Sequence, residues 1–495
     1  MSVLGRNMVV NVAGRGWTAL VQIAFIPMLL RLLGADGFGL VGVFLTLQAA
    51  SQILENSYAL TVNREIARLR GSGQGGIPAV LRTAEVMAWL TAVGFAAILA
   101  VLVPLLSGVW LTADTLAAST LTTALWLMVP TLGLQLGAGL YVGALLAGDR
   151  HGTANLLLAT TATLRSGGAA AVVMLTDGGV LTYFLWQIAV ALFHAGSGAL
   201  LAWRSVARTG APARFERARL RLFASFGGGM LGIGLLGVLL AQMDRIILAR
   251  WAGLTELGYY TFTASLAAVL LYLAGPISQG VFPALAGALG RTDRAEAERI
   301  FATGTQVLGA LVVPAGVALA VFGHEIVTVW TGDAALAARL APLLALLAVG
   351  STLNAVVYLP SHLYLASGRT RLVVAFSAIA ASVLGAALVP LIDRFGALGA
   401  AVGWVALNLA YAAVLAPLIL RRVLPGQGWP WALRGVLVPL AVALPLIGAA
   451  RLAMPAEPTL STTIGLPVAG GLAAVLLAAA AAPELRARLT KGMTN

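Results

Sequence analysis

The chain alternates long apolar runs with short polar segments that are rich in arginine. A run of about 20 apolar residues can cross the roughly 30 Å hydrocarbon core of a bilayer as a helix, which satisfies its own backbone hydrogen bonds. About fourteen such runs are present, over residues 8–33, 38–62, 83–107, 117–147, 155–176, 180–203, 226–251, 257–288, 301–328, 336–366, 371–392, 396–420, 432–452 and 461–482. The pattern predicts an all-α polytopic membrane protein. Pro130, Pro276 and Pro360 lie inside the fourth, eighth and tenth runs, where we expect kinks.

Composition agrees with a lipid environment. Of the 495 residues, 60% are hydrophobic and 10% are charged, which leaves too little charged surface for a water-soluble protein of this size. The net charge of +13 comes from arginines that lie between the apolar runs, where membrane topology explains them, so we expect no nucleic-acid partner. The first run is long enough to span and is not followed by a convincing small-residue cleavage site, which argues against a cleaved signal peptide.

Residue counts exclude several kinds of catalytic and metal site. The chain contains no cysteine, so thiolate metal sites and cysteine nucleophiles are excluded. Its only lysine is Lys491, so a phosphate-binding loop of the GxxxxGK[ST] type cannot occur. The four histidines lack the spacing of a zinc-binding helix, and no long outer loop is present that would hold a polymerase or ligase active site. We therefore expect no enzyme, no metal and no cofactor.

The arginines are distributed unequally between the two sides of the predicted helices. Cytoplasmic segments normally carry the excess of arginine and lysine. If the N-terminus is cytoplasmic, that side collects most of the basic residues. The opposite side receives only arginines in short turns, namely Arg31, Arg250, Arg339, Arg394 and Arg451. Both termini are therefore predicted to be cytoplasmic.

A spacing of 219 residues recurs along the chain and indicates a duplicated unit. At this spacing Arg31, Gly34, Gly39, Ala147 and Arg150 match Arg250, Gly253, Gly258, Ala366 and Arg369, in that order. The spacing covers six predicted helices, an even number, so the two halves should have the same orientation and be related by an axis along the membrane normal.

The repeat predicts two six-helix bundles, residues 1–203 and 226–422. Residues 204–225 form the most polar segment, a basic cytoplasmic linker. Its arginines fit either a face that lies on anionic lipid or a loop that only sets topology. Residues 423–495 hold two additional helices and a basic tail, and they fall outside the repeat without candidate chemistry.

Four predicted helices carry a polar stripe. In the first helix, Asn11, Arg15, Thr18 and Gln22 lie within about 60° of arc at 100° per residue. The second helix contributes Gln48, Gln52 and Glu55, the seventh Gln242 and Arg245, and the eighth Thr261, Ser265, Tyr272 and Gln279. Lipid cannot satisfy these groups, so they face one another or water. Interhelical hydrogen bonds in a tight bundle are one interpretation. The second interpretation is a water-filled cavity bounded by these four helices. It is favoured because the stripes lie at equivalent positions of the two repeats.

Charged residues inside the apolar runs indicate either a site or an ion pair, because a charge deep in a spanning helix costs roughly 2.5–3.5 kcal/mol on insertion scales. Asp244 and Arg245 lie together at the second beginning of the repeat. Arg15 and Glu55 each lie about 10 Å from the predicted inner face by helix rise, so a structural ion pair is an alternative to ligand binding for both. Arg165, in the fifth helix, is expected to snorkel or to pair.

Several sequence motifs, in this order and spacing, resemble the multidrug/oligosaccharidyl-lipid/polysaccharide (MOP) exporter superfamily, and within it the polysaccharide transporters that flip lipid-linked oligosaccharides. The matching residues are Asn11 and Arg15, RLLGADGFG, the NREIA of residues 63–67, MDRIIL followed by GLTELGYY, and LASGR. The resemblance covers roughly residues 8–420. It implies two six-helix bundles that form a V around a central cavity, with alternating access driven by a proton or sodium gradient.

The resemblance implies a flippase of the bacterial inner membrane that moves an undecaprenyl-diphosphate-linked oligosaccharide to the periplasmic leaflet for surface polysaccharide synthesis. Arg15 and Arg245 would then bind the diphosphate, because guanidinium forks suit phosphate oxygens. Substrate contacts are expected from Asn11, Thr18, Gln22, Gln48, Gln52, Tyr272 and Gln279, and ion coupling from Glu55 and Asp244. Membrane lipids and polysaccharide-assembly proteins are the other expected partners. Alternatives are a lipid II flippase, a cation-coupled multidrug antiporter, and a non-transporting scaffold that docks through the linker.

Overall fold

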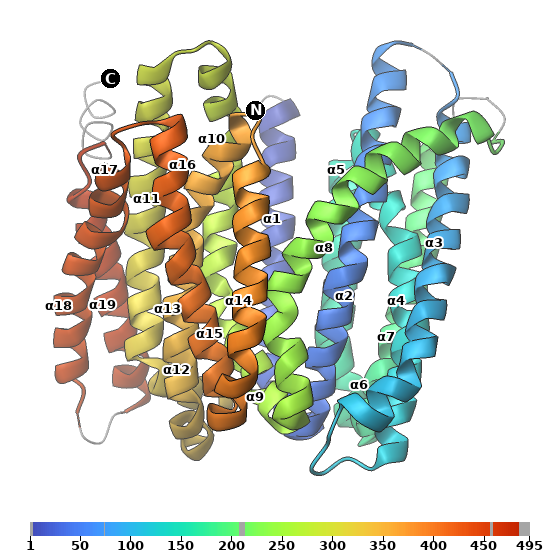
Figure 1. Ribbon diagram of the computed structural model, residues 1–495. Coiled ribbons are helices and arrows are strands. Elements are labelled where there is room, and N and C mark those ends of the chain that lie inside the picture. Colours follow the sequence, from blue (N-terminus) through green and yellow to red (C-terminus); the bar gives the residue numbers. More distant parts are fainter. Residues whose placement is uncertain (1–2, 74, 207–212, 456–458, 485–495) are drawn as a thin grey trace. The chain divides into compact units, whose positions relative to one another are not determined.

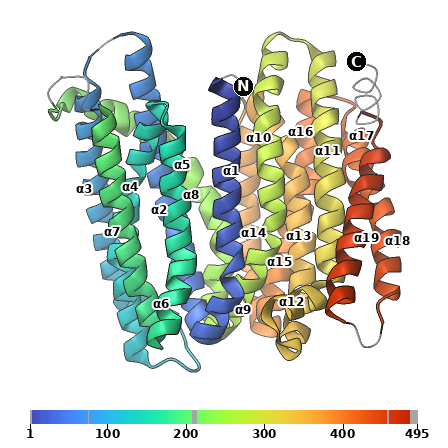
Figure 2. The same ribbon diagram turned by 180° about the vertical axis from the view of Figure 1, so that it is seen from behind.

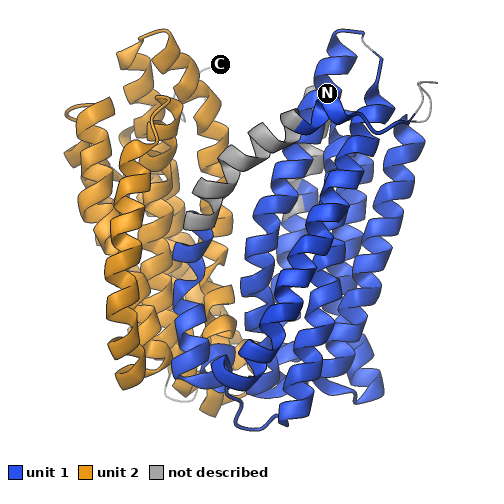
Figure 3. Ribbon diagram, turned by 45° about the vertical axis from the view of Figure 1, so that its right-hand side comes forward, with its two compact units in different colours: residues 1–259 blue, residues 260–495 orange. Residues whose placement is uncertain are grey.

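The computed structural model describes residues 3–484 apart from 74, 207–212 and 456–458, and every regular element in this part is a helix (Figure 1). Twelve helical segments of the described part are long and apolar enough to cross a membrane. The predicted all-α polytopic architecture is confirmed. Contacts within the chain define two compact units, residues 1–259 and 260–495 (Figure 3). The predicted bundles, which rest on the repeat and divide at the linker, stay a prediction.

The first unit contains the helices that carry most of the predicted site residues. They are α1 (Val3–Ala24), α2 (Ile26–Gly71), α3 (Ile77–Leu105), the π-helical η1 (Leu106–Trp110), α4 (Ala118–Ala147), α5 (His151–Thr163), the π-helical η2 (Leu164–Gly168), α6 (Ala169–Thr176), α7 (Gly179–Val206), the 3-10 turn η4 (Arg217–Arg219), α8 (Leu220–Trp251) and the first turns of α9 (Gly253–Ala267). In both views α4 lies among α2, α3 and α7, and it packs against all three (Figures 1 and 2).

The second unit is built around α11 and α13. Its elements are the rest of α9, α10 (Val269–Gly290), α11 (Arg294–Val321), α12 (Gly323–Thr331), α13 (Ala334–Ala366), α14 (Arg371–Phe395), α15 (Ala397–Ala410), η5 (Tyr411–Leu415), α16 (Ala416–Val423), α17 (Gly428–Ala432), η6 (Leu433–Leu437), α18 (Val438–Leu452) and α19 (Leu460–Ala480). The last two helices pack against α11, and the buried Glu325 of α12 pairs with Arg451 of α18.

The helix bounds agree with the predicted runs in most places, but the runs are divided at Phe25, Ala268 and Phe322. A first break lies at Phe25, and the predicted break near residue 34 is present as a kink at Gly34, where the backbone leaves helical geometry with φ 70° and ψ 174°. The eighth predicted helix is divided at Ala268, eight residues before Pro276. α4 and α13 run on through Pro130 and Pro360. Membrane helices tolerate proline because neighbouring groups satisfy the freed carbonyls.

The two segments that share the 219-residue spacing touch each other within the first unit. Gly39 lies so close to α9 that a Cβ atom there would overlap the carbonyl oxygen of Leu254, and a Cβ on Gly258 would overlap that of Ala35. The buried Asp36 accepts a hydrogen bond from Thr255, again 219 residues away. The recurring glycines therefore allow close backbone approach where α2 crosses α9.

Candidate functional site

A cavity of about 560 Å³ lies within the first unit, between α2, α8 and the junction of α3 with η1. Most of its lining is apolar, with Val43, Leu47, Leu105 and Leu239 among the lining residues. The polar side chains on its wall are those of Thr46, Gln242 and Arg245, together with the indole of Trp110.

The polar groups of the cavity are joined by hydrogen bonds between α2 and α8. The Nη1 of Arg245 donates to the Oε1 of Gln242 at 3.3 Å, and the Oγ1 of Thr46 donates to the same oxygen at 3.4 Å. Gln242 and Arg245 are three residues apart and therefore lie on one face of α8. Asp244 is buried, with 7% of its surface exposed, and its Oδ1 accepts a hydrogen bond from the backbone N–H of Arg245. The Arg245 guanidinium is thus held at the cavity wall.

A second polar cluster lies inside the bundle formed by α2, α4, η2 and α7. The half-buried Glu55 of α2 lies directly on Gly139 of α4, where a Cβ atom would overlap the glutamate side chain. The charge of Arg165, from η2, interacts electrostatically with Glu55 and with Tyr183. The structure therefore associates Glu55 with Arg165. The alternative pairing with Arg15 is not tested, because the side chain of Arg15 lies outside the described part.

The π-helical turn η2 positions Arg165. A π turn leaves carbonyl groups without their usual helical partners, and such turns are frequent at functional sites. Trp186 and Gln187 of α7 satisfy two of them: the indole N–H donates to Leu164 O at 2.7 Å, and the amide donates to Arg165 O at 2.9 Å. The Nε of Arg165 and the Oε1 of Gln187 are buried without a hydrogen-bond partner among the described residues.

Gln48 of α2 belongs to the same bundle interior. Its amide donates to the Oε1 of Gln135 at 2.6 Å, and the Nε2 of Gln135 is buried without a partner in the described part of the chain. Gln135 lies one helical turn from Gly139, the residue beneath Glu55. Buried polar groups without protein partners are where ordered water or a ligand binds. The chemistry available here is the binding of a proton or a small cation beside Glu55.

The remaining predicted residues are placed as follows. Thr18 is half-buried and donates to Gly14 O at 2.9 Å in its own helix, and Gln22 and Gln52 are exposed. Tyr272 and Gln279 are exposed on α10, in the second unit. The side chain of Asn11, like that of Arg15, lies outside the described part. The cavity predicted among four helices stays a prediction. The cavity that the structure describes is lined mainly by the second and seventh of them with α3 and η1, and Leu257 at the start of the eighth also lines it.

Three contributors were missed at the level of sequence. Thr46 lies two residues before Gln48, the first polar position selected on α2, and Gln135 and Gln187 are single amides in largely apolar helices. A lone polar residue inside a spanning helix is itself a functional signal. That signal identifies the residue but not its partner on another helix.

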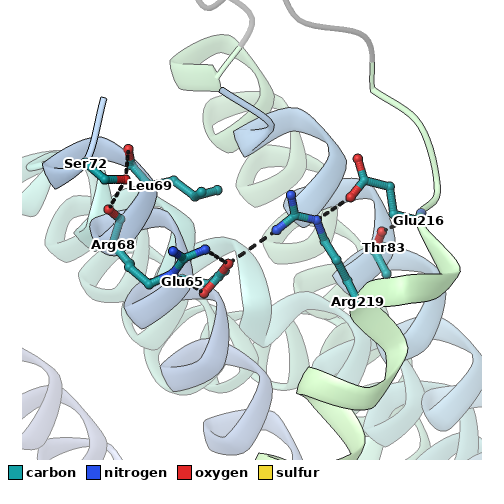
Figure 4. Close-up of polar contacts among 7 residues, drawn as sticks. All are labelled: Glu65, Arg68, Leu69, Ser72, Thr83, Glu216 and Arg219. Carbon is teal, nitrogen blue, oxygen red and sulfur yellow. Dashed lines mark hydrogen bonds and ion pairs between the residues drawn. The ribbon is translucent and has the colours of Figure 1, made fainter. Parts of the chain in front are cut away.

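An ion-pair network ties the end of the linker to α2 and α3 (Figure 4). Glu65 of α2, within the NREIA motif, accepts hydrogen bonds from Arg68 at 2.7 and 3.0 Å and from Arg219 of η4 at 3.3 Å. Arg219 also bonds to Glu216, whose backbone N–H donates to the Oγ1 of Thr83 at 3.1 Å. Part of the linker thus pairs with protein, whereas residues 207–212 lie outside the described part.

Replacing Arg219 by alanine is expected to loosen this junction. The substitution removes the contact between η4 and α2 but leaves Glu65 paired with Arg68, so the free energy of unfolding should fall by only about 0.5–1.5 kcal/mol. Protease nicking within residues 204–220 should rise in purified protein. Arg217→Ala, which removes an exposed arginine two residues away, is the matched control. Equal nicking of the two variants would show that the network does not hold the linker.

The family of this chain follows from a match to its sequence. The family model described as polysaccharide biosynthesis protein matches residues 4–288, more than half of the chain. The chain belongs to this family. The matched region covers the first unit from residue 4 onward, including the cavity at Arg245 and the cluster at Glu55. No curated protein matches the chain.

Solved structures show the fold of this polysaccharide biosynthesis protein. The lipid II flippase MurJ in an inward closed conformation is similar with a TM-score of 0.69 and 12% identity, over 98% of this chain and 100% of that one. An inward-facing MATE multidrug transporter of the MOP superfamily is similar with a TM-score of 0.70 and 14% identity, over 82% of this chain and 94% of that one. A Vibrio cholerae MATE transporter, VcmN, is similar with a TM-score of 0.54 and 16% identity, over 86% of this chain and 96% of that one. The chain is a multi-pass membrane protein of the polysaccharide biosynthesis family, and its fold is similar to that of these transporters.

Proposed function

We propose that this protein is a flippase for an undecaprenyl-diphosphate-linked oligosaccharide, which it moves from the cytoplasmic to the periplasmic leaflet of the bacterial inner membrane by alternating access. Both termini are proposed to be cytoplasmic. The family supports a role in polysaccharide biosynthesis, and the fold supports transport. The observation that carries the proposal is the guanidinium of Arg245 on the wall of a membrane-embedded cavity.

The chemistry of the substrate explains why an arginine is needed there. A diphosphate loses its hydration when it enters a low-dielectric region, which is prohibitive unless fixed cations replace the water. A guanidinium donates two parallel hydrogen bonds to phosphate oxygens. Gln242 accepts a hydrogen bond from the Nη1 of Arg245, which fixes the orientation of the guanidinium group. The alkyl part of the lipid would lie along apolar surface while the glycan occupies a wetter region.

The cluster around Glu55 supplies the coupling half of the proposal. Glu55 and Arg165 are opposite charges within the bundle, beside buried amides that lack partners among the described residues. Protonation of Glu55 would release Arg165 from its counter-charge and change the packing of η2 against α7. A proton gradient is therefore the proposed driving force, with sodium as the competing ion.

Removing the charge of Arg245 is expected to reduce flipping strongly. Arg245→Gln should lower the rate about tenfold to a hundredfold, since hydrogen bonds to charged groups contribute about 1.5–3 kcal/mol each. Arg245→Lys should retain only part of the rate because an ammonium cannot reproduce the fork. The assay is translocation of a fluorescent undecaprenyl-diphosphate oligosaccharide in proteoliposomes under a proton gradient.

The control for this assay is Arg250→Gln, which removes the same charge from the same helix five residues further along. Its rate should stay near that of the wild type. Equal rates for Arg245→Gln and wild type would reject the role of Arg245 in diphosphate binding. Proton-coupled efflux of organic cations without lipid flipping would reject the flippase and favour a multidrug antiporter.

A further inference from the structure

We propose that the apolar cavity between α2, α8 and η1 is a binding groove for the polyprenyl chain of a lipid diphosphate, with Arg245 as the contact for its diphosphate. The identity of the head group rests on the proposed function. The groove itself rests on the geometry of the first unit. It lies at the end of the bundle that carries Trp110 and Trp251, which the arginine distribution predicts to be the periplasmic end.

The dimensions of the groove suit a single extended chain. On α8 its wall runs from Val238 to Ala249, which is about 16 Å by helix rise. The opposite wall comes from Val43 to Ala50 of α2. A volume of about 560 Å³ between nearly apolar walls takes an isoprenoid segment without desolvating a polar group.

The groove is held open on one side by a fixed contact. The indole N–H of Trp110, at the end of η1, donates to the backbone carbonyl of Ile246 on α8 at 3.2 Å. The Trp110 ring also meets the Trp251 ring edge to face, with 6.3 Å between the ring centroids. These contacts tie η1 to α8 and form a wall that exists without a ligand.

The polarity of the groove matches a lipid in the leaflet next to Trp251. Tryptophan rings lie at the membrane–water interface, and Arg245 lies six residues, or about 9 Å of helix, from Trp251 toward the membrane centre. Val238 and Leu239 lie deeper still. A lipid of that leaflet has its charged group near the interface and its chain toward the centre. In the groove, likewise, Arg245 lies nearer the interface and the apolar residues Val238 and Leu239 lie nearer the membrane centre.

The charge on the wall favours a diphosphate over bulk phospholipid. Arg245 is the charged residue that lines the groove, and no carboxylate lines it in the described part. A diphosphate carries more negative charge than a phosphodiester and offers oxygens on two phosphorus atoms to the fork. We infer that the groove retains the flipped polyprenyl diphosphate on the exit side before release.

Photocrosslinking at matched positions tests the groove. A photoreactive phenylalanine replaces Leu105, which lines the groove, or Val101, which lies one turn away on α3 with 79% of its surface exposed. The full-length protein in phosphatidylglycerol nanodiscs is illuminated with labelled undecaprenyl diphosphate. Labelling at position 105 should exceed that at 101 at least about fivefold. Adding Arg245→Gln should lower it about tenfold, as expected for the loss of hydrogen bonds to a charged group.

A competition measurement covers the case in which the Arg245→Gln variant does not fold. With Arg245 intact, unlabelled undecaprenyl diphosphate should suppress labelling at position 105, whereas undecaprenol, which lacks the diphosphate, should not. Equal labelling at 101 and 105 would overturn the proposal and identify the groove as an ordinary lipid-facing surface. Equal competition by undecaprenol would reject Arg245 as the contact for the diphosphate.

The outcomes separate this inference from the proposed function. Selective labelling by undecaprenyl diphosphate in a protein that flips no oligosaccharide would leave the groove standing and reject the flippase. Flipping without selective labelling would reject the groove and leave the flippase standing. The crosslinking needs no glycan, and the flipping assay needs no photoreactive residue, so neither result depends on the other.

Discussion

Gly39→Val is expected to prevent stable folding of this protein. The substitution places a branched side chain where α2 crosses α9, against the carbonyl oxygen of Leu254. Backbone cannot move aside as a flexible side chain can, so the helices must separate and lose the hydrogen bond that Asp36 accepts from Thr255. Overpacking alone costs about 1–3 kcal/mol, and the lost bond to the buried carboxylate adds to it.

Thermal unfolding in detergent and the yield of monodisperse protein measure this effect. Gly258→Val should behave in the same way, because a Cβ there meets Ala35 O. Gly94→Val on α3 is the control, since no atom lies within 4 Å of the position that its Cβ would take. A Gly39→Val protein with the wild-type unfolding midpoint would show that α2 and α9 do not cross at this distance.

Arg165→Ala is expected to be the most damaging single change of charge. It leaves the half-buried Glu55 without the nearby positive charge, and because the two side chains, both among the described residues, form no direct ion pair, the cost should lie below the ~3–5 kcal/mol of breaking a fully buried pair. Removing both charges with Glu55→Gln and Arg165→Gln leaves no uncompensated charge, so the double variant should recover much of the folding stability. Yield and unfolding midpoint of the two single variants and the double variant give the coupling directly.

Transport by the recovered double variant then separates a structural pair from a coupling site. If Glu55 carries the proton, the folded double variant should flip lipid only down its concentration gradient and should not respond to a pH gradient. Wild-type response to the pH gradient would assign the pair to stability alone. A double variant less stable than either single one would contradict the pairing of Glu55 with Arg165.

Much of the architecture could be predicted because the bilayer imposes it. Each span needs about 20 apolar residues whatever it packs against, so run lengths give the approximate bounds of most helices. The breaks within helices were harder to place. Pro130 and Pro360 lie in uninterrupted helices, and the division at Ala268 has no proline or glycine beside it. Such breaks depend on which neighbouring groups satisfy the freed carbonyls.

The candidate site divides in the same way. Period and hydrophobicity identified Gln48, Glu55 and Arg245 as polar groups in apolar helices, because the cost of placing them in lipid belongs to each residue alone. Partners are a different matter. That Glu55 associates with Arg165, Gln48 with Gln135 and Gln242 with Thr46 depends on which helix faces bundle packing brings together.

The 219-residue spacing shows both sides of this division. The sequence by itself determined that Arg31, Gly34 and Gly39 begin a segment whose pattern returns at Arg250, Gly253 and Gly258, since a repeat is a property of the chain alone. Only the tertiary structure decided that the two segments touch. Asp36 accepts a hydrogen bond from Thr255, Gly39 lies against the carbonyl oxygen of Leu254, and Gly258 lies against that of Ala35. The physical reason is that close approach depends on the shapes of two surfaces that are distant in sequence, and local propensity contains no information about their meeting.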